Sequence, residues 1–66
     1  MRFREVRKVL LAAGFTERHA KGSHVVFFHP DGRYATVPNH GGRDLKRGTL
    51  ASISRSTGIR LSPEKE

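Results

Sequence analysis

The chain has 66 residues, and its 13 Lys and Arg against 6 Asp and Glu give a formal charge of +7. A domain this small buries only about 60% of the surface that its unfolded chain exposes, and without cysteine it can form neither disulfides nor thiolate metal sites. No apolar run has the length of a membrane span or the pattern of a signal peptide. We therefore expect a single cytoplasmic domain over residues 1–66, frayed over 62–66. Its charge favours nucleic acid as the partner, with an acidic protein as the main competitor.

The first periodic segment runs from about residue 2 to residue 13. Its apolar side chains recur at helical spacing and leave a basic outer face; they are Phe3, Val6, Val9, Leu10 and Ala13. Gly14 supplies the left-handed residue that follows the last turn of many helices, and Phe15 stands where an apolar contact back onto the helix is usual. The pattern predicts an amphipathic helix that ends there.

Three segments with the alternation of β-strands follow, over residues 15–20, 24–29 and 33–37. The sequences between them, Lys21-Gly22-Ser23 and Pro30-Asp31-Gly32, are typical of turns. We therefore predict two successive hairpins. Pro38 closes the third strand because it has no N–H to donate to a ladder.

A polar, glycine-containing loop over 39–46 leads to a second predicted helix, and Leu45 is the residue expected to anchor this loop. Thr49 is the expected N-cap. Gly58 is the expected terminator, after which Ile59 folds back. The side chains expected to point inward are Leu50, Ile53 and Thr57.

The order helix, three strands, helix predicts an antiparallel meander with both helices on one face, an α+β two-layer sandwich. The opposite face of the sheet, called the open face below, then stays uncovered. Alternation places His24, Val26 and Phe28 on this face, and Tyr34 joins them from the third strand. The alternative architecture is a swapped or obligate dimer in which a second copy covers the open face.

His24 is the candidate catalytic residue, although a lone histidine usually has a structural role. It stands at the entry of the strongest strand, beside Lys21 on the preceding turn. A neutral imidazole can take the proton from a ribose 2′-hydroxyl while a cation offsets the charge that builds on the phosphate. This combination favours cleavage of a phosphodiester without a metal or another cofactor.

Polar residues near the turns are the candidate contacts to RNA, namely Lys21, Ser23, Arg33, Lys46 and Arg47. The stretch 46–48 precedes the second helix and can seat a phosphate against free N–H groups at the helix N-terminus, with a solvated turn as the alternative. Val26, Phe28 and Tyr34 form the candidate surface for a protein partner, because a small protein normally hides such side chains.

Two other kinds of site fit poorly. The histidines at positions 19, 24, 29 and 40 match no common spacing of zinc ligands, and His24 and His29 should point to opposite faces. Ser23 lacks the base, the orienting acid and the elbow motif of an acyl-transfer nucleophile. We therefore expect no metal site and interpret Ser23 as a turn residue.

Several motifs occur together in a characteristic order: Gly14-Phe15, Lys21-Gly22-Ser23-His24, His29-Pro30-Asp31-Gly32, Val37-Pro38-Asn39-His40, Leu45-Lys46-Arg47-Gly48-Thr49-Leu50 and Gly58-Ile59. In these motifs the chain resembles the HicA-type toxins, which are mRNA interferases, from about Val6 to Ile59. The resemblance implies a double-stranded-RNA-binding-like fold, cleavage of messenger RNA and neutralisation by a HicB-type antitoxin. The active histidine of that family corresponds to His24.

Three functions therefore stay open. The leading hypothesis is a metal-independent ribonuclease, the toxin of a type II toxin–antitoxin system, with His24 as general acid or base. The second is a non-catalytic RNA-binding module of the same fold. The third is a protein-interaction domain that uses the apolar open face.

Overall fold

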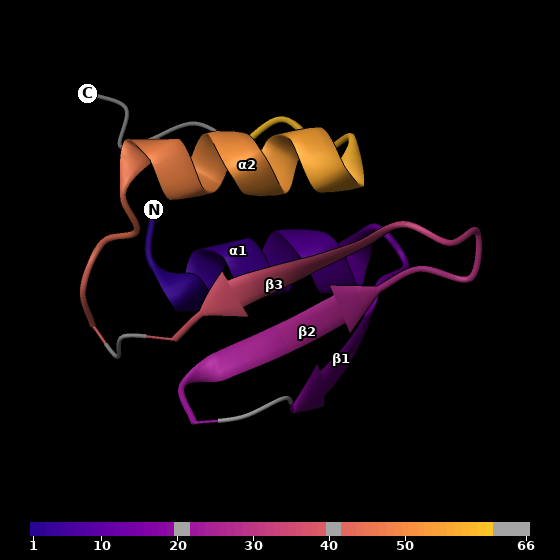
Figure 1. Cartoon of the computed structure of the whole chain (residues 1–66), viewed down its shortest axis with the longest axis horizontal. Coiled ribbons are helices and arrows are strands. Elements are labelled where there is room, and N and C mark those ends of the chain that lie inside the picture. Colours follow the sequence, from indigo (N-terminus) through magenta and orange to yellow (C-terminus); the bar gives the residue numbers. More distant parts are fainter. Residues whose placement is uncertain (20–21, 40–41, 62–66) are drawn as a thin grey trace.

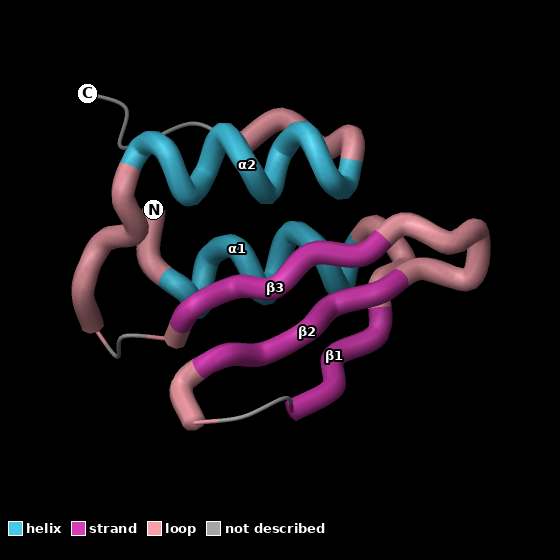
Figure 2. Tube along the Cα trace, viewed as in Figure 1, coloured by secondary structure: helices cyan, strands magenta, loops and turns pink. Residues whose placement is uncertain are grey.

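A computed structural model describes residues 1–19, 22–39 and 42–61, apart from the side chain of His19 (Figure 1). Within these ranges the elements are α1 (Phe3–Ala12), β1 (Thr16–His19), β2 (His24–Phe28), β3 (Tyr34–Pro38) and α2 (Arg47–Thr57). The strands form one antiparallel sheet in the order β1-β2-β3, and both helices lie on the same side of it (Figure 2). The predicted α+β two-layer sandwich of the double-stranded-RNA-binding-like type is confirmed. The tail predicted to fray, 62–66, lies outside the described residues.

The helix α1 has defined signals at both ends. At its start, the Glu5 carboxylate accepts a hydrogen bond of 2.8 Å from the backbone N–H of Arg2. At its end, the N–H groups of Gly14 and Phe15 donate to the carbonyls of Leu11 and Leu10, at 3.1 and 3.0 Å. Gly14 has a φ of +97°, so the predicted glycine terminator is confirmed as a Schellman motif.

The first two strands are slightly shorter than predicted and the third is shifted by one residue, but their pairing follows the predicted hairpins. The His29 N–H donates to the Arg33 carbonyl at 2.8 Å and closes a three-residue loop, in which Gly32 has a φ of +103°. Pro38 is the last residue of β3 rather than the residue after it, and it pairs with His24. A proline is tolerated there because β3 is an edge strand.

The core lies between the sheet and the two helices. Val25 and Phe27 of β2 are buried, and the ring of Phe27 lies 6.2 Å from that of Phe3 on α1, centroid to centroid. The other buried apolar residues are Val6, Leu10, Phe15, Ala35, Val37, Leu45, Leu50, Ile53 and Leu61. Among the described residues no helix is long and apolar enough to cross a membrane.

The prediction that Thr49 caps the second helix is wrong, because α2 begins at Arg47 and Lys46 occupies the N-cap position. The cause is tertiary: Leu45 is buried, and its N–H donates to the Met1 carbonyl at 2.7 Å. This anchor fixes the chain direction before Thr49 is reached. Lys46 has no side-chain acceptor, and its side chain makes no capping hydrogen bond to the first turn.

The end of α2 is held by the buried Thr57. Its Oγ1 donates to the Ile53 carbonyl at 2.8 Å and accepts from the Ile59 N–H at 3.2 Å. Gly58 follows with a φ of +75°, and Ile59 packs against the core, as predicted. One hydroxyl therefore closes the helix and directs the chain that follows.

Replacing Thr57 by valine should lower the free energy of unfolding by about 1–2 kcal/mol, because the shape is kept while the Ile59 N–H loses its acceptor. Urea unfolding measures this change. Ser52 is exposed on the same helix, and Ser52→Ala should change stability by less than about 0.5 kcal/mol. Equal stability of the Thr57→Val protein and the wild type would show that the hydroxyl is not needed.

Candidate nucleic-acid interface

The open face consists of the side chains that point away from the helices. They are Thr16 and Arg18 from β1, His24, Val26 and Phe28 from β2, and Tyr34 and Thr36 from β3. The alternation in burial along β2 confirms this orientation, because Val25 and Phe27 are buried while the residues between them are at least partly exposed. Tyr34 shares the face with His24, Val26 and Phe28, as the sequence predicted.

His24 is exposed at the first position of β2, the central strand. Its backbone is held firmly, because it pairs with Pro38 and because the neighbouring Ser23 carbonyl accepts a hydrogen bond of 2.6 Å from the Asn39 N–H. Among the described residues, none makes a hydrogen bond or an ion pair with its imidazole. The ring is thus accessible on a fixed backbone, which suits a group that exchanges protons with a ligand.

Basic side chains lie at the same end of the molecule as His24. Pro38, the strand partner of His24, lines a hollow of about 260 Å³, whose other lining residues are Arg43, Asp44, Leu45, Lys46 and Thr49. In Figure 1 the start of α2 lies on the same side of the molecule as the end of β3. Lys46 and Arg47 are both exposed, and the first N–H groups of α2 add positive character to this end.

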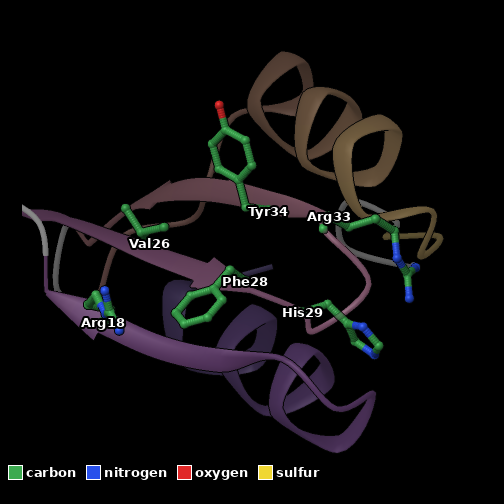
Figure 3. Close-up of a pocket in the computed structure, with 7 residues that line it drawn as sticks. Arg18, Val26, Phe28, His29, Arg33 and Tyr34 are labelled. Carbon is green, nitrogen blue, oxygen red and sulfur yellow. The ribbon is translucent and has the colours of Figure 1, made fainter.

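A second hollow, of about 430 Å³, opens at the other end of the open face. It is lined by Arg18, Val26, Phe28, His29, Gly32, Arg33 and Tyr34 (Figure 3). The Arg18 guanidinium lies over the ring of Phe28, with its central carbon 4.9 Å from the ring centroid. The structure thus gathers the candidate partner-binding residues Val26, Phe28 and Tyr34 in one place, separate from His24.

Arg33 has strong contacts within the protein. Its Nε donates to the Asp31 carboxylate at 2.9 Å, its Nη1 donates to the Thr57 carbonyl at the end of α2, and its guanidinium lies 5.2 Å from the Phe15 ring centroid. A cation is favourable at the C-terminus of a helix, where carbonyls are unpaired. Arg33 therefore fastens the β2–β3 loop to α2, whatever else it binds.

The same loop perturbs the acidity of Asp31. The Arg33 backbone N–H donates to the carboxylate at 3.1 Å, and this hydrogen bond, followed by the Arg33 side chain, lowers the pKa of Asp31 below its ordinary value. His29 faces the covered side, packs edge-on against Phe15 at 5.1 Å and accepts from the Asp31 N–H at its Nδ1. His29 thus packs within the protein and points to the opposite side of the strand from His24, as predicted, although it also lines part of the 430 Å³ hollow.

Of the remaining candidate residues, the structure describes Ser23 but not Lys21. Ser23 is exposed on the turn before His24, whereas Lys21 lies outside the described residues, as does His40. Sequence reasoning missed Arg18 and Arg43. Arg18 pairs with Val26 across the β1–β2 ladder, and only this register brings it to the hollow. The alternation along β1 is the sequence signal that could have shown that Arg18 lies on the open face.

A compact basic α+β domain with one uncovered sheet face thus carries an accessible histidine at one end and an aromatic hollow at the other. Comparison with protein families shows that residues 3–59 match the family described as the HicA toxin of bacterial toxin-antitoxin systems. Because the match covers most of the chain, the protein belongs to this family of toxins. Membership implies an antitoxin as its partner. A search of curated proteins finds no match.

Arg33→Ala should lower the free energy of unfolding by about 1 kcal/mol, because a charge-assisted hydrogen bond to the end of α2 is lost from a partly exposed side chain. Lys46→Ala is the matched control, since Lys46 is exposed and caps nothing, and it should stay within about 0.5 kcal/mol. Urea unfolding of both variants tests this. Two variants of equal stability would contradict the fastening role of Arg33.

Proposed function

We propose that the protein is a ribonuclease toxin that cleaves messenger RNA, with His24 as its general acid or base and without a metal cofactor. The observation that supports this most directly is the position of His24: an accessible imidazole on the central strand of an uncovered face, in a member of the HicA toxin family. The formal net charge of the chain, +7, attracts the polyanionic substrate.

The chemistry requires few groups. Neutral His24 takes the proton from a ribose 2′-hydroxyl, whose oxygen forms a bond to the adjacent phosphorus as the bond to the 5′-oxygen breaks. The products are a 2′,3′-cyclic phosphate and a 5′-hydroxyl, and the proton returns to the leaving oxygen. Negative charge builds on the phosphate during the step, so nearby cations lower the barrier.

Two of the cations assigned to this step, Lys46 and Arg47, lie at the His24 end. Lys46 and Arg47 stand at the start of α2, where free N–H groups also favour an anion, and Lys21 precedes His24 by three residues in the sequence. Ser23 is exposed beside His24 and offers a hydroxyl to the backbone of the RNA. Arg33 contributes to RNA binding only through the part of its guanidinium that Asp31 and Thr57 leave accessible.

The partner proposed for the open face is a HicB-type antitoxin. Val26 and Phe28 are partly exposed and Tyr34 is 63% exposed, so a free toxin presents apolar surface to water. A partner that covers these three side chains and extends along β2 would also block His24. Acidic residues on that partner would mainly speed association.

Incubation of the purified wild type with messenger RNA in the presence of EDTA should give cleavage, and His24→Ala should abolish it. The mutant should fold normally, because His24 is exposed and loses little packing, so its stability should change by less than about 1 kcal/mol. Induced expression should likewise arrest growth only for the wild type. RNA binding without cleavage by the wild type would favour the non-catalytic binding module, and cleavage by His24→Ala would show that another residue is catalytic.

Phe28→Ser should weaken binding of the cognate antitoxin by at least about tenfold, because a large apolar side chain near the centre of the interface is lost. Leu11→Ser is the matched control, because Leu11 is a large apolar residue that is exposed on α1, away from the sheet. Calorimetric titration measures both variants. Unchanged affinity for Phe28→Ser would place the antitoxin interface elsewhere.

A further inference from the structure

The hollow at the Tyr34 end of the open face has a lining unlike that of an ordinary protein groove. Its volume of about 430 Å³ is within the range of small-ligand sites, and its lining combines the rings of Phe28 and Tyr34 with the His29 imidazole and two arginines, without an acidic side chain. It lies away from His24, at the opposite end of β2. The proposed cleavage chemistry therefore leaves this hollow without a role.

The hollow exists because two neighbouring rings diverge. Phe28 and Tyr34 are directly opposite in the register, and the hydrogen bond between His29 and Arg33 makes them a non-hydrogen-bonded pair, in which side chains approach most closely. Nevertheless, the ring of Phe28 turns towards β1, where Arg18 lies over it, while the ring of Tyr34 projects outward (Figure 3). A flat face of Tyr34 is therefore left open towards the hollow.

The charge beside the hollow indicates which kind of ligand would bind there. The guanidinium of Arg18 is close to the hollow and, among the described residues, has no acidic partner. A single strand of RNA offers a flat aromatic base and an adjacent phosphate anion together, and it matches an aromatic ring beside an unneutralised arginine. A base inside a duplex is stacked on both faces and cannot enter.

We propose that this hollow binds one unpaired base of the RNA substrate, which stacks on Tyr34 while Arg18 contacts a neighbouring phosphate. The inference rests on the proposed function and names a specificity site within it. His24 and Phe28 are four residues apart on β2, which corresponds to about 13 Å of strand. The bound base and the cleaved phosphate therefore belong to different nucleotides, and the enzyme should require an unpaired base beside its cleavage point.

The sequence supplies a direct probe, because Tyr34 is the only tyrosine and tryptophan is absent. His24→Ala protein, which should leave RNA intact, is titrated with a short oligouridylate and with a ribose-phosphate strand of equal length that lacks bases. Tyrosine fluorescence follows stacking, and anisotropy of a labelled strand follows affinity. Free tyrosine at the same concentration corrects for light that the RNA absorbs.

We expect the oligouridylate to quench the fluorescence and to bind about five- to hundredfold more tightly than the strand without bases. Tyr34→Ala, added to the His24→Ala background, should remove most of this difference, whereas Tyr34→Phe should preserve it. Leu11→Ala controls for loss of an exposed apolar side chain elsewhere. Because Tyr34 is exposed, urea unfolding should show that the alanine variant folds like its parent.

The outcomes separate this inference from the proposed function. If the wild type cleaves RNA but Tyr34→Ala keeps the full difference between the two strands, the base site is wrong and the ribonuclease stands. If Tyr34→Ala removes the difference in affinity between the two strands but the wild type cleaves nothing, the base site stands and the proposed ribonuclease activity is wrong. Binding of neither strand overturns the base site, and it overturns the ribonuclease as well if the wild type also cleaves nothing. A requirement for Tyr34 in antitoxin binding alone assigns the hollow to the protein partner.

Discussion

The strand β2 is hydrogen-bonded on both sides, and its two-residue alternation decides which of its side chains enter the core and which reach the open face. Val25 and Phe27 point into the single layer of core under the helices, so His24, Val26 and Phe28 must point the other way. A slip of one residue in the register would exchange the two faces. The burial of the core residues and the exposure of the open face thus both follow from the register of β2 with its neighbouring strands.

Because the chain is small, its two helices cover one face of the sheet and leave the other face uncovered. Two short helices suffice to bury one side of a three-stranded sheet, and no described element remains to cover the other side. A rigid sheet also holds exposed side chains more firmly than a loop does. An exposed histidine at a strand entry therefore combines access to a ligand with a fixed backbone.

The two ends of the open face differ in chemistry. At the His24 end, the start of α2 and its basic residues favour phosphate, whereas at the Tyr34 end two rings and Arg18 favour a flat ligand. The contacts of Arg33 connect the second end to the core, because they join the β2–β3 loop to the end of α2. An inhibitor that spans the face would cover both ends at once, and a single-stranded ligand of sufficient length would also contact both.

The sequence by itself determined the element order, the glycine that ends each helix and the face on which each strand residue lies. These features are local, because a left-handed residue and a period of two are set by neighbouring residues alone. Only the tertiary structure decided the rest. The anchor between Leu45 and Met1 moved the N-cap of α2 from Thr49 to Lys46, and the β1–β2 register brought Arg18 over Phe28. Arg33 is fixed by the Thr57 carbonyl, 24 residues further along the chain, and no local pattern encodes a contact between segments that meet only after folding.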